Sequence, residues 1–225
     1  DKVIAQTADL IGKKILITAG GTREPIDPIR FIGNRSSGKQ GFALAMAAAS
    51  RGAQVHLVIA NSDLPNIDGI TTTAVETAEE MAAILNLEFP HCDALIMSAA
   101  VADAKVVNYS EGKIRKESLD KVELAKNPDI LKSLAHIKRP GQIVVGFAAE
   151  TMSSVDALQK SGHEKLSSKN LDLIYVNDVS DGAIFGQEKT KGIIIDNSNN
   201  VIKVPEISKD TLADILLDQL VSKLG

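Results

Sequence analysis

The stretch "KKILITAGG", Lys13 to Gly21, decides the fold because it reads as a single buried β-strand that ends in glycines. It is short, apolar and rich in β-branched residues, as strands at the centre of a sheet are. The sequence "GFALAMAAASRG", residues 41–52, follows as a helix closed by Gly52, and "AQVHLVIA", residues 53–60, follows as a second strand. This order predicts two parallel strands joined by a helix.

The same alternation of strands and helices continues to residue 178. It predicts an α/β fold, a Rossmann-like, doubly wound, mostly parallel sheet with helices on both faces. A C-terminal β-hairpin over residues 191–208 is expected at one edge of the sheet, before an amphipathic helix at residues 209–224. The three further strands are expected at residues 92–103, 142–150 and 171–178.

Two of the expected helices begin with recognisable capping residues. Thr77 precedes the first of them, and Glu80, three residues later, completes a capping box. Asn127 is expected to cap the second, with Pro128 at the first helical position. The helices are expected at residues 78–89, 128–137 and about 153–165.

Length and composition limit the class of protein. The 225 residues are 44% hydrophobic, enough for one sizeable core, and we expect one domain over residues 1–225. Residues 1–12 are expected to be a linker from a preceding domain, and residues 104–122 a mobile flap. The net charge of −4 and the lack of a long apolar stretch predict neither nucleic acid nor a membrane as a partner. Cys92 is the only cysteine, which excludes an intramolecular disulfide and suits the cytoplasm.

A long loop rich in Gly, Pro and Arg follows the first strand. Its segment "GNRSSGKQG", residues 33–41, resembles a Walker phosphate-binding loop, but Gln40 stands where a magnesium-binding hydroxyl is needed. Residues 22–32 also separate it from the strand, so we exclude a P-loop NTPase. Ser36, Ser37 and Gly38 lead into the helix, whose free N–H groups would suit a phosphate or another anion.

A nicotinamide cofactor is supported less well by the residues at the first turn. The sequence "AGGTRE", residues 19–24, lacks the third glycine of a dinucleotide fingerprint, and no acidic residue follows "HLVIA" to hold a ribose. A Rossmann-type NAD(P)-dependent oxidoreductase therefore stays an alternative, as does a non-enzymatic nucleotide-binding module. Ligands of such sheets bind beyond the carboxyl ends of the strands, where the other candidates lie.

Small and aromatic residues follow two of those strands. In "SAAVAD", residues 98–103, small side chains would let a flat ring approach the backbone, and Asp103 could bind a ribose hydroxyl or a metal. Ordinary helix–strand packing explains the small residues equally well. Phe147 in "GFAAET" would either stack on a base or pack in the core.

Two groups of cations also lie beside strand ends. Lys113, Arg115 and Lys116 belong to a polar segment at residues 106–124 that reads as a surface hairpin or a mobile flap. Such a charge run is most often a solvated face. Lys165 and Lys169 lie four residues apart and would share one helical face if the helix continues. In an acidic protein, two lysine groups beside strand ends indicate a triphosphate.

At this point the sequence resembles a known family, the bacterial phosphopantothenoylcysteine synthetases. The resemblance covers nearly the whole chain from about Lys13. In many bacteria this synthetase is the C-terminal half of a bifunctional protein whose other half is a flavin-dependent decarboxylase, and a chain without an initiator Met fits an excised half. The resemblance rests on "GGTREPIDPIRFIGNRSSGKQG", "SAAVAD", "KNPDIL", "VGFAAET" and "KNLDLIYVNDV", in this order.

The resemblance implies an acid–amine ligase of coenzyme A biosynthesis. The carboxylate of 4′-phosphopantothenate would attack the α-phosphorus of CTP, with Mg²⁺ as cofactor, and pyrophosphate would leave. The amine of L-cysteine would then attack the acyl cytidylate and displace CMP. The resemblance also implies a homodimer, because the phosphopantothenate part of the site forms near a subunit interface.

The resemblance assigns roles to residues of this sequence. Asn34 would donate its amide to the acyl intermediate, Lys113 would close over the phosphates, and Arg30 would lie near the phosphopantothenate; these three are the expected catalytic residues. Lys160 is an alternative to Lys165 as a phosphate contact, but Lys165 keeps the family's spacing. Asp103 is the expected metal ligand. The nucleotide would contact Ser98, Ala99, Ala100, Asp103, Lys113, Pro128, Asp129, Ile130, Leu131, Phe147, Lys165 and Lys169.

Overall fold

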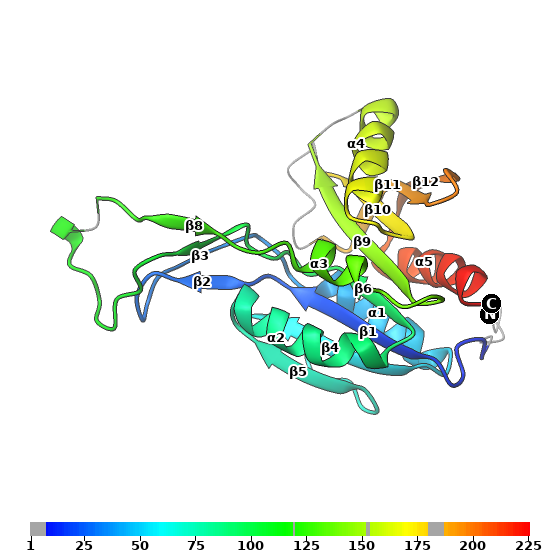
Figure 1. The fold of residues 1–225 in the computed structure, drawn as a ribbon, viewed down its shortest axis with the longest axis horizontal. Coiled ribbons are helices and arrows are strands. Elements are labelled where there is room, and N and C mark those ends of the chain that lie inside the picture. Colours follow the sequence, from blue (N-terminus) through cyan, green and yellow to red (C-terminus); the bar gives the residue numbers. More distant parts are fainter. Residues whose placement is uncertain (1–7, 119, 152–153, 180–186) are drawn as a thin grey trace.

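A mixed β-sheet forms the centre of the molecule, flanked by helices (Figure 1). The computed structural model describes residues 8–118, 120–151, 154–179 and 187–225; residues 1–7 of the expected linker lie outside these ranges. Within the described residues the sheet has eight strands in the order β12-β11-β10-β9-β6-β1-β4-β5. They are β1 (Lys14–Gly20), β4 (Gln54–Ala60), β5 (Thr71–Val75), β6 (Ala94–Met97), β9 (Ile143–Glu150), β10 (Leu173–Asp178), β11 (Lys189–Asp196) and β12 (Val201–Ser208).

The strand order confirms the doubly wound prediction. Every neighbouring pair from β5 to β10 is parallel, and β11 and β12 add an antiparallel hairpin at one edge. The chain winds outward from β1 to β5 and then returns to β6 on the other side of β1. The order therefore reverses between β1 and β6, where open α/β sheets form their ligand crevice.

The helices cover both faces of the sheet, as expected. Ile15 and Ile17 of β1 belong to a core with α1 and α5, whereas Leu16 belongs to a core with α2, α3 and α4. This alternation follows from the two-residue period of a strand. Among the described residues, no helix has the length and apolarity that a membrane crossing needs. The helices are α1 (Lys39–Ser50), α2 (Ala78–Glu88), α3 (Ile130–His136), α4 (Val155–Ser168) and α5 (Lys209–Leu224), with short 3-10 turns η1 (Phe89–His91) and η2 (Lys116–Ser118).

The helix starts confirm one expected cap and correct another. Thr77 and Glu80 form the expected capping box at α2. The cap of α3 is Asp129, whose carboxylate accepts a hydrogen bond from the backbone N–H of Lys132 at 3.0 Å. The prediction for Asn127 was wrong because its side-chain amide instead donates to the carbonyl of Ala102 at 3.0 Å, which holds the loop before the helix. Pro128 accordingly precedes the cap.

Strand β5 was missing from the sequence prediction. It lies at the sheet edge, and none of its five residues is buried. Its threonines therefore give no apolar signal, although Thr71–Val75 pairs with β4 in parallel register. The strand predicted at residues 92–103 also ends earlier, at Met97, because the following loop leaves the sheet.

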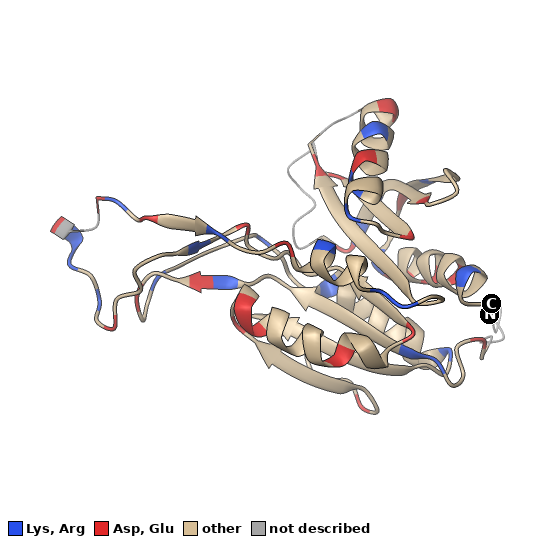
Figure 2. Ribbon diagram, in the orientation of Figure 1, with Lys and Arg blue, Asp and Glu red and all other residues tan. Residues whose placement is uncertain are grey.

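Two paired hairpins extend from the sheet as one arm (Figure 1). The first pairs β2 (Arg23–Pro25) with β3 (Phe31–Gly33), and the second pairs β7 (Ala104–Val106) with β8 (Leu124–Lys126). The segment at residues 104–122 thus begins with one strand of a surface hairpin, which was one of the two interpretations of its sequence. That this segment is a mobile flap stays a prediction. Figure 2 shows acidic and basic residues alternating along the arm and α4.

The edge hairpin contains an irregularity. Strands β11 and β12 pair in antiparallel register, with a shift between Thr190 and Gly192. Thr190 pairs with Ile207 and Gly192 with Val204, so Pro205 lies within this irregular stretch of the outer strand.

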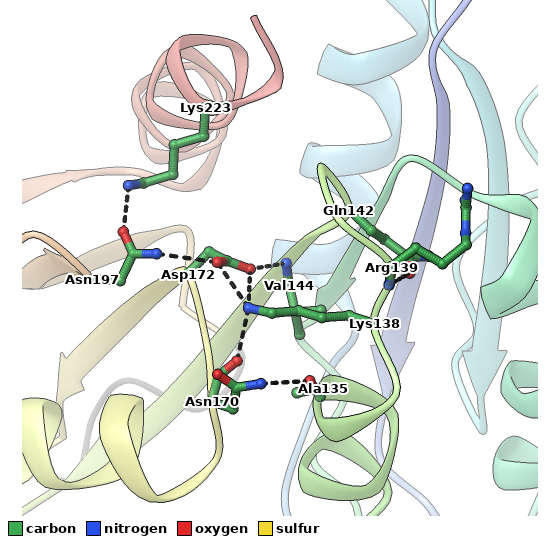
Figure 3. Close-up of polar contacts among 9 residues, drawn as sticks. All are labelled: Ala135, Lys138, Arg139, Gln142, Val144, Asn170, Asp172, Asn197 and Lys223. Carbon is green, nitrogen blue, oxygen red and sulfur yellow. Dashed lines mark hydrogen bonds and ion pairs between the residues drawn. The ribbon is translucent and has the colours of Figure 1, made fainter.

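A polar network closes the amino ends of β9 and β10 (Figure 3). Lys138 Nζ donates to both carboxylate oxygens of Asp172 at 2.8 Å and to the carbonyl of Asn170 at 3.0 Å. Asp172 also accepts hydrogen bonds from the backbone N–H of Val144 at 2.8 Å and from the Asn197 amide at 3.1 Å. This network joins α3, β9, β10 and the edge hairpin on the side of the sheet away from the strand carboxyl ends.

Candidate active site

Two loops meet where the sheet order reverses, after β1 and after β6. The Thr18 hydroxyl accepts a hydrogen bond from the Ala99 N–H at 3.0 Å, and the Thr22 hydroxyl accepts one from Ala102 at 2.8 Å. The Thr22 N–H donates to the Ala100 carbonyl at 3.2 Å. Both threonines are fully buried. These hydrogen bonds therefore hold the backbone of the small residues after β6 in place, and its other side faces a cleft.

A cleft of about 440 Å³ lies against this backbone. It is bounded by the loop after β6, the N-terminal end of α3, the end of β9 and the last turn of α4. Twelve of the fourteen residues that the sequence predicts for the site line this one cleft; Arg30 and Lys113 do not. The lining consists of Asn34, Met97, Ser98, Ala99, Ala100, Val101, Ala102, Asp103, Asn127, Pro128, Asp129, Ile130, Leu131, Phe147, Ala148, Ala149, Lys165, Lys169, Leu171 and Ile174.

Asn34 reaches the cleft from the loop between β3 and α1. Its side-chain amide donates to the Val101 carbonyl at 3.0 Å, 67 residues away in the sequence. This contact uses one of the two amide hydrogens and fixes the side chain beside the loop after β6. The second amide hydrogen is not used by this contact, and Asn34 itself is exposed at the rim of the cleft. Asn34 is thus held where it could donate to a ligand.

Lys165 and Lys169 both line the cleft, which agrees with the expected shared helical face. Lys165 forms an ion pair with Glu150, and Lys169 forms one with Asp129 at 2.8 Å. The hydrogen bond from Lys165, aided by the Ser161 hydroxyl, lowers the pKa of Glu150 despite its partial burial. Both lysines remain partly exposed, so an anion entering the cleft could replace either carboxylate as partner.

Burial alone would raise the pKa of Asp129, but hydrogen bonds from Lys169 and from the Lys132 N–H outweigh it, so the pKa is lowered. Asp129 therefore serves both as the cap of α3 and as the partner of a cleft lysine. The alternative phosphate contact, Lys160, is an exposed residue outside the cleft lining. The geometry favours Lys165 over Lys160.

Phe147 lies between the cleft and a smaller pocket of about 140 Å³ and lines both. Its ring meets the Tyr175 ring edge-on, with centroids 5.6 Å apart and planes at 68°. The sequence left open whether this ring packs or binds a base. Its edge packs against Tyr175, while the residue stays only partly buried and bounds both cavities.

The smaller pocket contains the N-terminal end of α1. Gly38 caps this helix in a left-handed conformation, with φ of 76°, and provides no side-chain acceptor for the first N–H groups. Lys39 pairs with Glu188, and burial lowers the pKa of Lys209, with the nearby Lys39 acting in the same direction. The pocket is lined by Arg35, Ser36, Ser37, Gly38, Lys39, Gln40, Ser98, Ala100, Phe147, Ala148, Ala149, Tyr175, Asn177, Thr190 and Lys209.

Arg30 lies on the arm. Its guanidinium pairs with the buried Asp27 and donates to the Ile114 carbonyl at 2.7 Å. The hydrogen bond from Arg30 is the largest influence on Asp27, and together with backbone N–H groups it holds the pKa of that carboxyl well below its usual range. Arg30 therefore locks the first hairpin to the second within one chain.

Lys113 also lies on the arm, as an exposed residue next to Ile114. Asp103 is exposed at the rim of the cleft. Among the described residues, no three His, Cys, Asp or Glu side chains come together as a metal site. A divalent cation here would need ligands from a substrate in addition to Asp103.

Asn61 occupies the place where dinucleotide-binding folds carry an acidic residue, directly after β4. Its side-chain amide donates to the carbonyls of Gly21 at 3.0 Å and Glu76 at 2.8 Å. The amide nitrogen is therefore committed to loop contacts. This argues against a ribose contact of the nicotinamide type.

Several lining residues were absent from the sequence prediction. Asn177 and Thr190 come from β10 and β11, and they meet only because these strands pair in antiparallel register. Lys209, at the start of α5, lines the same pocket. Asn127 lines the cleft, whereas the sequence predicted it as a helix cap. Asn177 stands in the motif "KNLDLIYVNDV", residues 169–179, which is the sequence signal for this position.

Comparison with known proteins identifies relatives over nearly the full chain. The family model described as DNA/pantothenate metabolism flavoprotein C-terminal domain matches residues 10–224. The coenzyme A biosynthesis bifunctional protein CoaBC of Escherichia coli is 39% identical over 226 residues, which cover 96% of this chain and 53% of that protein. CoaBC of Mycobacterium tuberculosis is 38% identical over 225 residues, covering 96% of this chain and 54% of that protein.

The chain thus spans about half the length of the curated relatives it matches. A solved structure, the C-terminal domain of a coenzyme A biosynthesis bifunctional protein CoaBC, is 34% identical with a TM-score of 0.82. The match covers 97% of this chain and 98% of that one. The arrangement of the sheet, helices and arm therefore agrees with a known domain as a whole.

Proposed function

The chain belongs to the family of DNA/pantothenate metabolism flavoprotein C-terminal domains, and on that premise we propose that it is a phosphopantothenate–cysteine ligase of coenzyme A biosynthesis. CTP would activate the carboxylate of 4′-phosphopantothenate as an acyl cytidylate, with loss of pyrophosphate. The amine of L-cysteine would then displace CMP. The bacterial relatives named CoaBC support a place in this pathway and a fusion to a second domain, which by resemblance is a flavin-dependent decarboxylase.

One observation carries the proposal: a single cleft at the reversal of the sheet collects an amide, two lysines, an aromatic ring and a fixed small-residue backbone. This combination suits a nucleoside triphosphate, whose ring would lie along residues 98–100 and whose phosphates would meet Lys165 and Lys169. Each lysine would exchange its carboxylate partner for a phosphate oxygen. The choice of CTP over other nucleotides rests on the family resemblance.

Asn34 is proposed to act in the second step. Its amide is already anchored on the Val101 carbonyl, so its remaining N–H would need little reorganisation to donate to the acyl oxygen as charge develops there. The N-terminal end of α1, in the smaller pocket on the other side of Phe147, would receive the phosphate of 4′-phosphopantothenate. The two cavities would then hold the two anionic substrates on either side of one ring.

The arm is proposed to complete the site in a homodimer. It carries Arg30 and Lys113 outside the cleft of its own chain, so their expected catalytic roles require a second chain or a movement of the arm. Large apolar side chains exposed together on a protein surface indicate an interaction site. Along the arm these are Ile29, Phe31, Val107, Tyr109 and Leu124.

Mg²⁺ fits the donors that the cleft offers. It usually binds one or two carboxylates together with substrate phosphates and waters. Asp103 is the carboxylate at the rim without a lysine partner among the described residues. Mg²⁺ would therefore enter with the nucleotide and neutralise phosphate charge, while Asp103 would contribute a protein oxygen.

The proposal is tested by product analysis of the purified chain. With CTP, Mg²⁺, 4′-phosphopantothenate and L-cysteine, we expect CMP and pyrophosphate in equal amounts. Omission of 4′-phosphopantothenate should stop the release of both. Folded, Mg²⁺-supplied protein that forms no CMP contradicts the ligase. Tight NAD(P)H binding without CTP binding in calorimetry would favour the oxidoreductase instead, and CTP binding without turnover would favour a nucleotide-binding module.

Two variants separate the half-reactions. Asn34→Asp should form acyl cytidylate and pyrophosphate but transfer slowly to cysteine, because the donor amide is replaced by a carboxylate. Lys113→Gln should slow pyrophosphate release itself. Lys116→Gln, a lysine change on the same arm, serves as the matched control. Loss of the same half-reaction in the Asn34 and Lys113 variants would contradict the assigned roles.

A further inference from the structure

Three polar side chains form a chain of hydrogen bonds beside the smaller pocket. Tyr175 and Asn177 lie two residues apart on β10 and so share one face of the sheet, and Thr190 lies on the neighbouring β11. The Tyr175 and Thr190 hydroxyl oxygens are 2.7 Å apart, and the Thr190 hydroxyl donates to Asn177 Oδ1 at 3.0 Å. Tyr175 and Thr190 are 1% and 4% exposed, respectively.

The chemistry of these groups gives the chain one direction. A threonine hydroxyl has a single hydrogen, and here Asn177 Oδ1 accepts it. The bond between Tyr175 and Thr190 must therefore use the tyrosine hydrogen, with Thr190 as acceptor. Burial raises the pKa of the Tyr175 hydroxyl, and the nearby Asp178 carboxylate acts in the same direction, so the hydroxyl keeps this hydrogen at neutral pH.

The direction determines which end of the Asn177 amide faces the pocket. With Oδ1 held by Thr190, the two N–H groups of Nδ2 lie at the opposite end of the planar amide and point away from Thr190. Asn177 lines the smaller pocket together with Gly38 and Ser37 at the start of α1, and among the described residues Nδ2 has no hydrogen-bond partner. A rotated amide would place two oxygens, Asn177 Oδ1 and the Thr190 hydroxyl, in the same donor-rich pocket.

We propose that Tyr175 and Thr190 are positioning residues that orient the Asn177 amide, so that its N–H groups donate to a phosphate monoester in the smaller pocket. This rests on the proposed function, which puts the phosphate of 4′-phosphopantothenate there. The chain of hydrogen bonds keeps the Asn177 amide turned as a donor, so the pocket favours a ligand group with acceptor oxygens, such as a phosphate, over a donor group. Thr190 acts from a strand on which no substrate contact was expected.

The experiment compares Thr190→Val with Thr190→Ser. Valine keeps the shape of threonine but removes the hydroxyl, whereas serine keeps the hydroxyl and is the matched control. With one substrate varied and the other two saturating, we expect Thr190→Val to raise the KM for 4′-phosphopantothenate about tenfold and to change the KM for CTP and kcat less than about twofold. Thr190→Ser should resemble the wild type. Tyr175→Phe should raise the same KM about threefold, because Thr190 can still donate to Asn177.

A purely structural role predicts a different pattern. It would lower the melting temperature and change all kinetic constants together, or leave the KM for 4′-phosphopantothenate unaltered in Thr190→Val; either result overturns the positioning role while the ligase stands. Calorimetric titration with 4′-phosphopantothenate alone needs no turnover, and Thr190→Val should show the same tenfold weaker binding. Wild-type protein that binds 4′-phosphopantothenate but forms no CMP contradicts only the ligase. Wild-type protein that neither binds nor turns over contradicts both.

Discussion

The two ends of the parallel strands use the same residue types in opposite ways. At the amino end, Lys138 and Asp172 form an ion pair in which the side chains are only 18% and 10% exposed. Every acceptor of Asp172 is engaged, because Val144, Asn197 and Lys138 all donate to it (Figure 3). This carboxylate contacts the loop after α3, strand β9 and the edge hairpin, and it has no capacity left for a ligand.

At the carboxyl end, each lysine of the cleft pairs with a single carboxylate. Lys169 and Asp129 are 31% and 41% exposed, and Lys165 is 39% exposed. Asp129 can be released to water when an anion arrives, at little cost because exposed pairs contribute little to stability. Glu150 is only 14% exposed, but it keeps the hydrogen bond from the Ser161 hydroxyl when Lys165 moves. Similar Lys–carboxylate pairs therefore serve stability where they are buried and fully bonded, and ligand exchange where water reaches them.

The largest effect is expected for Asp172→Ala at the amino end. It removes a carboxylate that satisfies a buried backbone N–H and a half-buried lysine, so we expect a loss of about 3–5 kcal/mol in the free energy of unfolding. Urea unfolding followed by circular dichroism measures it. Asp129→Ala at the carboxyl end is the counterpart and should cost about 1–2 kcal/mol, mainly through the lost helix cap. Equal losses in the two variants would contradict the comparison.

Lys169→Gln at the carboxyl end should weaken ligand binding and leave stability unchanged. Loss of one charged contact to a phosphate should raise the KM for CTP about tenfold, which corresponds to about 1.4 kcal/mol, with an unchanged melting temperature. Steady-state rates at varied CTP measure it. Lys160→Gln on the same helix is the matched control and should leave the KM unaltered. An equal rise in the control would mean that the effect comes from general charge rather than contact.

A smaller effect is expected for Glu150→Gln, and it should depend on pH. Because the pKa of Glu150 is lowered in the folded protein, its pair with Lys165 stabilises the fold above the ordinary glutamate value of 4.5 and loses this contribution as the pH falls through the lowered value. The stability difference from the wild type should be below about 1 kcal/mol at pH 7 and smaller at pH 3. Urea unfolding at both pH values gives the difference, and Glu164→Gln on α4 is the control. A difference that grows with acidity would reverse the sign and contradict the pair.

The smallest effect concerns Cys92, at the amino end of β6. Burial raises the pKa of its thiol to about 11, and the thiol donates to the Phe89 carbonyl at 3.3 Å. We expect a thiol reagent at pH 8 to modify the native protein far more slowly than the urea-unfolded protein, with no change in CMP formation. Mass spectrometry over time measures the modification. Rapid labelling of the native chain would show that the amino end of the sheet opens readily.

The sequence predicted the parallel part of the fold because its signals are local. Buried strands such as Ile143–Glu150 are continuous apolar runs, and the capping box of Thr77 spans four residues. The edge strand β5 was not predicted because its threonines do not form an apolar run. The strands of the arm were not predicted individually because each has only three residues. They depend on contacts such as that of Arg30 with Ile114, 84 residues apart.

The site could be predicted as far as it follows strand ends. The motif at residues 98–103 follows the carboxyl end of β6, and Phe147 lies in the second half of β9. The four-residue spacing of Lys165 and Lys169 places both at the C-terminal end of α4, where they line the cleft. In the smaller pocket, the predicted residues are Ser36, Ser37 and Gly38, together with Ser98, Ala100 and Phe147, which also line the cleft. The opposite wall of the smaller pocket comes from antiparallel pairing of β10 with β11, and no local pattern reveals which residues such pairing brings together. The same reason explains why Thr190 gave no signal.

Pro205 on the outer strand of the edge hairpin has a consequence for solubility. A strand at the border of a sheet exposes unpaired backbone groups that can recruit a further strand from another molecule. Proline has no N–H to offer, and the shifted pairing around Thr190 and Gly192 bends the strand at the same place. Proline and the irregular pairing thus make the border on the side of β12 a poorer template for strand addition and for the aggregation that follows from it.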